Sequence, residues 1–132
     1  MKLLADTSAL LALVLKDDEH HAAAAGFLRR AGRVRFVVTE LILAEFATRL
    51  RAGGDAAVAV RFARDLLRSE RYQLIFADDE LVAAGLDRME QFSDKELSLA
   101  DCVSFELIDR LRLDGAFTFD RDFRDCGFRM VP

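Results

Sequence analysis

Residues 2–15 read KLLADTSALLALVL, a short apolar run that ends in Asp6 and is followed at once by a longer apolar stretch. The first run, Lys2–Ala5, predicts a buried strand. Asp6 and the two residues after it are types that cap helices, so the second stretch predicts a helix over Ala9–Leu15. A strand that passes directly into a helix is typical of α/β proteins.

The alternation of strand and helix patterns continues along the whole chain. Further strands are predicted over Arg33–Val38, Tyr72–Phe76, Ala116–Phe119 and Phe128–Val131. Further helices are predicted over Glu19–Ala31, Glu40–Arg51, Asp55–Ser69, Asp79–Phe92 and Ser98–Leu113. This order predicts a three-layer α/β/α sandwich around a central, mainly parallel sheet. A length of 132 residues predicts a single domain, residues 1–132.

Composition excludes several classes of protein. With 52% hydrophobic and 32% charged residues, the chain is neither a disordered tail nor a membrane protein. Its net charge of −4 argues against binding to nucleic acid through overall charge alone. Cys102 and Cys126 are too far apart for a C-x-x-C motif. We expect reduced thiols and a cytoplasmic protein without a secretion signal or membrane anchor.

Two of the predicted strands run into an aspartate, Asp6 after the first and Asp120 after Phe117-Thr118-Phe119. Parallel sheets place their active sites beyond the carboxyl ends of the strands, so both carboxylates would emerge at one edge. Each aspartate also has a purely structural interpretation. Asp6 could cap the following helix, and Asp120 could open an Asx turn.

A third carboxylate, Asp101, lies at the edge of an apolar helical stripe made of Leu97, Ala100, Val103, Leu107, Ile108 and Leu111. A carboxylate beside a buried face needs a partner, which could be an arginine or a metal ion. Glu45 is not singled out by spacing, because it lies to one side of its own helix stripe and could pair with Arg49. If these acids converge, their oxygen ligands suit Mg²⁺ or Mn²⁺, and no His or Cys is placed for zinc or iron.

Four segments together resemble the PIN-domain family, and within it the VapC-type ribonuclease toxins of toxin–antitoxin pairs. They are LADTSAL at 4–10, TELILAE at 39–45, DKELSLADCVSF at 94–105 and AFTFDRDF at 116–123. The resemblance implies an acidic quartet of Asp6, Glu45, Asp101 and Asp120 as catalytic residues. It also implies Mg²⁺ or Mn²⁺ bound chiefly by Asp6 and Asp101, with Ser8 and Thr118 as supporting hydroxyls.

The same resemblance implies endonucleolytic cleavage of RNA, a small antitoxin partner and a homodimer. Asp122 departs from the pattern, since similar toxins often carry His there; it could alter metal binding or be a solvated residue. Asp94 could be an outer residue of the metal site or a loop cap. The other functions we considered are an RNA-processing nuclease that is not a toxin and a non-catalytic scaffold that binds RNA or protein.

Three arginines, Arg61, Arg64 and Arg68, share one helix face. An RNA contact is one interpretation of this face, and a solvated, salt-bridged surface with Asp65 is the simpler one. The pair His20-His21 is expected in a loop or at a helix start. The eleven Phe are expected mostly in the core rather than in a base-stacking platform.

Overall fold

Strand β1 (Lys2–Ala5) lies at the centre of a five-stranded sheet in the order β3-β2-β1-β4-β5. The other strands of the computed structural model, which describes all 132 residues, are β2 (Arg35–Thr39), β3 (Tyr72–Ile75), β4 (Ala116–Phe117) and β5 (Met130–Val131). Every neighbouring pair is parallel. All five strands therefore end at the same side of the sheet, which we call the carboxyl edge.

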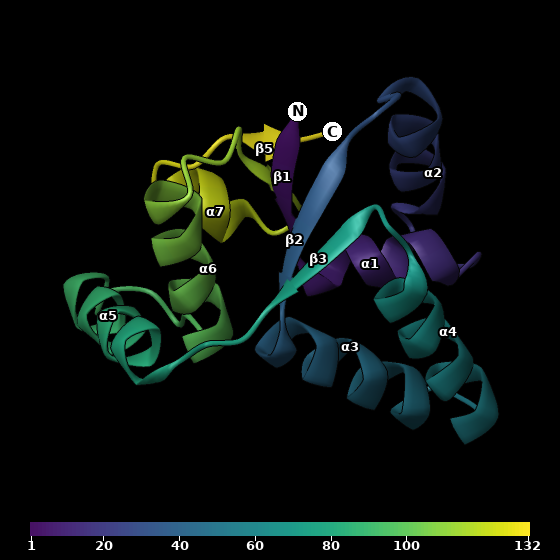
Figure 1. The fold of residues 1–132 in the computed structure, drawn as a ribbon, viewed down its shortest axis with the longest axis horizontal. Helices are drawn as coiled ribbons and strands as arrows, with labels where there is room; N and C mark the ends of the chain where they lie inside the picture. The colour runs from purple at the N-terminus through teal and green to yellow at the C-terminus, as the bar shows by residue number, and fades with distance from the viewer.

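Seven helices cover the sheet. They are α1 (Thr7–Val14), α2 (His21–Arg30), α3 (Glu40–Ala52), α4 (Ala56–Arg68), α5 (Asp79–Gln91), α6 (Leu99–Arg110) and α7 (Arg121–Asp125). Helices α5, α6 and α7 lie on one side of the sheet, and α1, α2 and α4 lie on the other (Figure 1). This arrangement confirms the predicted three-layer α/β/α sandwich.

The core is built on β1, whose Leu3, Leu4 and Ala5 are fully buried. A strand covered on both faces must be apolar throughout, which explains why this run does not alternate. On one side, α5 packs closely against α6, where a Cβ at Gly85 would lie only 2.7 Å from Cγ2 of Val103. No helix is both long enough and apolar enough to span a membrane.

Several element boundaries differ from the sequence predictions. Helix α6 ends at Arg110, so Leu111 lies beyond the apolar stripe and is 41% exposed. Strand β4 has only two residues, and the short helix α7 that follows was not predicted. Both cysteines are free thiols, as expected.

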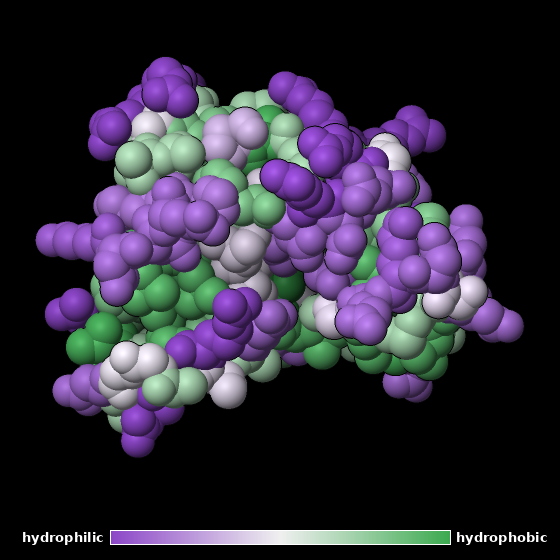
Figure 2. Space-filling view, turned by 180° about the vertical axis from the view of Figure 1, so that it is seen from behind, coloured by the Kyte–Doolittle hydropathy of each residue, from purple (hydrophilic) through white to green (hydrophobic).

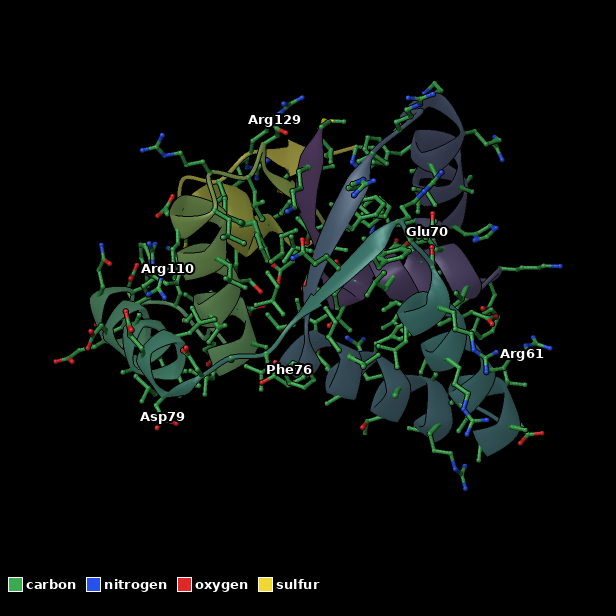
Figure 3. The ribbon with its side chains drawn as sticks, viewed as in Figure 1. Arg61, Glu70, Phe76, Asp79, Arg110 and Arg129 are labelled. Atoms are coloured by element: carbon green, nitrogen blue, oxygen red, sulfur yellow. The ribbon has the colours of Figure 1, made fainter.

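The arginine face of α4 also differs from expectation. Arg61, Arg64 and Arg68 are exposed, as predicted, but none of them forms an ion pair with Asp65 or any other acid. Figure 3 shows Arg61 extending outward from α4. The face is therefore solvated as predicted, but the predicted salt bridges with Asp65 are wrong.

Candidate active site

The sheet order creates a switch point at β1. The chain leaves β1 to build β2 and β3 on one side, whereas β4 and β5 lie on the other side. In open parallel sheets, ligands bind in the crevice where the strand order reverses, beyond the carboxyl ends. Asp6 follows β1 directly, and Asp120 lies three residues beyond the end of β4. Both predicted carboxylates therefore emerge at the switch point.

Asp6 is buried, with 6% of its surface exposed. It occupies the N-cap position of α1, but its side chain makes no capping hydrogen bond. Instead, its Oδ2 accepts hydrogen bonds from Ser8 Oγ at 2.8 Å and from Thr118 Oγ1 at 2.9 Å. Burial raises the pKa of Asp6 despite these donors, and the charge of Asp120 adds to the increase. The capping interpretation does not account for this side chain.

Asp101 is the third residue of α6 and forms a capping box with Ser98. Ser98 N donates to Asp101 Oδ2 at 3.2 Å, and Asp101 N donates to Ser98 Oγ at 3.0 Å. Burial, followed by the charge of Asp6, raises the pKa of Asp101 to about 6. Asp101 takes part in no ion pair, so the alternative of a buried Asp–Arg pair was wrong.

Asp120 combines a structural role with a place at the carboxyl edge. Its Oδ1 accepts a hydrogen bond from Asp122 N at 2.9 Å and so caps α7, as the turn interpretation expected. Its own backbone N donates to Thr118 Oγ1 at 3.0 Å, which joins it to the Asp6 network. Its charge contributes to the raised pKa of both Asp6 and Asp101. Asp6, Asp101 and Asp120 are therefore electrostatically coupled, and we call them the edge carboxylates.

Glu45 lies at the border of this group. Thr7 Oγ1 donates to Glu45 Oε2 at 3.2 Å, which ties Glu45 to the residue that follows Asp6. Its other oxygen, Oε1, lies 3.6 Å from Arg49 Nη1, the pair that helical spacing had offered as an alternative. Both interpretations of Glu45 therefore have a contact in the structure. Thr7 was missed as a site residue, although it stands within the Asp6-Thr7-Ser8 motif.

The donor chemistry of the edge carboxylates fits a divalent cation. None of the three forms an ion pair, so their mutual repulsion is not compensated by any basic side chain of the protein. Oxygen ligands of this kind suit Mg²⁺ or Mn²⁺. In this structure, however, no group of three His, Cys, Asp or Glu side chains has the geometry to hold a metal ion. Asp101 and Asp120 each turn one oxygen toward a backbone N–H, which leaves the other available.

Two further acids were considered for the site. Asp94 Oδ2 lies 3.3 Å from Lys95 Nζ, in an exposed ion pair. Asp122 stands in the first turn of α7 and is bonded to Asp120 only through its backbone N–H. Partial burial and the charge of Asp120 raise the pKa of Asp122, and Lys95 opposes the increase. Neither side chain therefore forms a hydrogen bond with the edge carboxylates.

Known proteins share this fold. VapC20 of Mycobacterium tuberculosis, a sarcin-ricin loop cleaving toxin, is 23% identical with a TM-score of 0.88, and 96% of each chain is covered. A toxin–antitoxin complex from Klebsiella pneumoniae is 15% identical with a TM-score of 0.70, over 98% of this chain and 96% of that one. VapBC2 from Rickettsia felis, bound to a DNA fragment from its promoter, is 11% identical with a TM-score of 0.71, over the full length of both chains.

Sequence comparison gives the family. No curated protein sequence matches the chain significantly. The family model of the PIN domain, however, matches residues 3–129, which is nearly all of the chain. The match includes every one of the four acids that the sequence resemblance had assigned to the site. The chain belongs to the PIN-domain family.

Proposed function

We propose that this protein is a metal-dependent endoribonuclease and the toxin of a toxin–antitoxin pair. The observation that carries the proposal is the group of edge carboxylates, which meet at the switch point of the sheet without a basic partner. Membership of the PIN-domain family and the VapC-like fold support the same activity. A structural role alone would favour pairing these acids with some of the 16 arginines in the chain.

Asp6 and Asp101 are the residues we assign to Mg²⁺ or Mn²⁺, with Glu45 and Asp120 as further ligands or as partners through water. When bound, such a cation lowers the pKa of a coordinated water and neutralises charge on the phosphoryl group under attack. Ser8 and Thr118 both donate to Oδ2 of Asp6 and so fix the orientation of its carboxylate. Loss of such supporting groups typically costs about 10- to 100-fold in metal affinity or activity.

The antitoxin would be a small protein that contacts apolar surface as well as the acidic site. Two of the solved relatives are toxin–antitoxin structures. In this chain, α1, α3 and α4 enclose a pocket of about 180 Å³ lined by Leu10, Leu13, Phe46 and Phe62 among others. Figure 2 shows a hydrophobic area among hydrophilic side chains on the side of α1 and α4. The homodimer implied by the sequence resemblance stays a prediction.

The proposal is tested by incubating purified protein with cellular RNA in Mg²⁺, in Mn²⁺ and in excess EDTA. We expect cleavage with either metal, none in EDTA, and none by Asp6→Asn. Asp109→Asn is the matched control, because it removes a carboxylate from the far end of α6 and should leave cleavage unchanged. Cleavage that persists in EDTA, or in Asp6→Asn, contradicts the mechanism.

The biological role is tested in cells. Induced expression of a toxin should arrest growth, and the arrest should be relieved by the product of a short neighbouring reading frame and be absent in Asp6→Asn. Cleavage in vitro with no arrest would instead support an RNA-processing nuclease. Binding of RNA without cleavage would support the non-catalytic scaffold.

A further inference from the structure

A stacked pair of rings lies beside the edge carboxylates. The rings of His20 and Phe119 are parallel within 3°, with centroids 4.3 Å apart. Phe119 is partly buried, and it continues inward to Phe117, whose ring centroid lies 6.4 Å away. His20 is the outermost ring, and 43% of its side chain is exposed. Because Phe119 covers one face of the imidazole, the exposed part of the His20 ring consists of its edges and its other face.

The ring pair is joined to the carboxylates through a short chain of contacts. Phe119 immediately precedes Asp120, and its backbone N donates to Ser8 Oγ at 3.0 Å. The same Ser8 hydroxyl donates to Asp6 Oδ2 at 2.8 Å. Two hydrogen bonds therefore connect the backbone of Phe119 to the most buried of the edge carboxylates. A polynucleotide with a phosphate at those carboxylates would have an adjacent base near the two rings.

The position of His20 is fixed by its backbone. Its N–H donates to Asp18 Oδ1 at 2.8 Å, and its carbonyl accepts from Ala24 N at 2.9 Å. The ring itself lies 3.3 Å, Nε2 to Oε1, from Glu19, which is largely exposed. An aromatic ring held in one orientation loses little conformational freedom when a flat ligand stacks on it.

We propose that the free face of His20, supported from below by Phe119, stacks a base of single-stranded RNA next to the phosphate that is cleaved. This inference rests on the proposed ribonuclease function and adds a binding position to it. Stacking on aromatic side chains is tolerant of sequence, because every base has a π face. In this proposal Phe119 supports the stacking ring, whereas the sequence predicts that the phenylalanines are mostly in the core and do not form a base-stacking platform.

The test measures binding rather than cleavage. The probe is a short single-stranded RNA containing 2-aminopurine, whose fluorescence falls when the base stacks, added to Asp101→Asn protein in Mg²⁺. We expect quenching on binding, a five- to fiftyfold weaker Kd and loss of quenching in His20→Ala, and recovery of both in His20→Trp. His20→Leu, which still covers Phe119 with apolar atoms, should fold normally without restoring the quenching.

Phe76 provides the matched control. It is 70% exposed directly after β3, a strand that β2 and β1 separate from β4, which precedes Phe119, and it is labelled in Figure 3. Phe76→Ala should leave binding and quenching unchanged. Unchanged binding in a folded His20→Ala, failure of His20→Trp to recover, or an equal loss in Phe76→Ala would each overturn the stacking proposal.

The readout separates this inference from the proposed function. In the cleavage-competent protein, His20→Ala should raise KM and leave kcat nearly unchanged. RNA cleavage with an unaltered KM in His20→Ala contradicts the stacking site alone. Absence of cleavage in the parent protein, with His20-dependent quenching retained, contradicts the nuclease and leaves an RNA-binding site.

Discussion

Helix α6 carries two kinds of carboxylate. At its N-terminal end, Asp101 belongs to the edge carboxylates, and burial and like charges raise its pKa to about 6. Further along the helix, Glu106 Oε2 lies 2.8 Å from Arg88 Nε, and the hydrogen bond from Arg88 lowers the pKa of Glu106. One helix thus holds an uncompensated acid and a compensated one, about a turn and a half apart.

The paired acids of α6 stabilise the fold, whereas the unpaired Asp101 belongs to the candidate site. Arg88 also lies within ion-pair distance of Asp109, and Arg110 lies 3.2 Å from Glu106, so the charges of this cluster largely cancel. Such an arrangement stabilises the packing of α5 on α6. The edge carboxylates, by contrast, destabilise the fold in the absence of a cation. The repulsion lowers the stability of the metal-free fold, but the same three carboxylates provide a site for a cation.

The largest effect is expected for Asp101→Asn. Loss of a carboxylate assigned to the metal should lower kcat/KM for RNA by at least about 100-fold. At the same time, removal of a charge that is partly buried and repelled by Asp6 should raise the metal-free free energy of unfolding at pH 7 by about 1–2 kcal/mol. This figure is reduced from the full pKa effect because Asp101 is partly exposed. Activity assays and urea denaturation in EDTA measure the two changes. A variant that loses stability together with activity would place Asp101 with the structural acids.

Arg88→Ala should lower the stability of the protein and leave its activity unchanged. It leaves Glu106 and Asp109 without their shared cation, and both Arg88 and Glu106 are about four-fifths buried. We expect a loss of about 1–3 kcal/mol in the free energy of unfolding, with kcat/KM unchanged within about twofold. Arg110→Ala is the control, since its side chain is 39% exposed (Figure 3) and should change stability by less than about 1 kcal/mol. A large loss of activity in folded Arg88→Ala would mean that the cluster supports the site.

The contributions of Asp101 and Glu106 to stability should also respond oppositely to pH. Between 3.8 and about 6, folded metal-free protein holds a proton on Asp101 that the unfolded chain has released, so stability falls as pH rises through this range. The lowered pKa of Glu106 acts below its ordinary value of 4.5, where stability is lost as pH falls. From these two groups, the contribution to stability measured by urea denaturation in EDTA should be greatest at about pH 4–5. Asp101→Asn should flatten the decline above that range, and a decline of unchanged slope would contradict the assignment.

The fold could be predicted because its signals are local. Apolar runs, capping residues and strand-terminal aspartates are all visible in single segments, and parallel strands bring Asp6 and Asp120 to one edge. Glu45 could not be singled out, because its link to the site is a hydrogen bond from Thr7, 38 residues earlier in the chain. Spacing within a helix carries no information on such a contact.

Two other features were not predicted, one because the segment is too short and one because the contact joins residues far apart in sequence. Helix α7 has five residues, too few for a periodic pattern. The stacking of His20 on Phe119 joins two loops that are distant in sequence. The capping box of Ser98 and Asp101 was visible as S-x-x-D and could have been predicted. Its presence does not weaken the functional assignment, because only one oxygen of Asp101 is used in it.

The smallest effect is expected for Asp122→Asn, which tests where the group of edge carboxylates ends. Asp122 offers its backbone N–H to Asp120, a bond that asparagine retains, and no side-chain bond joins it to the other acids. We expect metal-dependent cleavage within about twofold of the parent and a change in stability below about 0.5 kcal/mol. Asp94→Asn, which removes an exposed partner of Lys95, is the control and should behave alike. A tenfold rise in the Mn²⁺ concentration needed for half-maximal cleavage by Asp122→Asn alone would extend the metal site to α7, because a merely solvated acid contributes nothing to metal affinity.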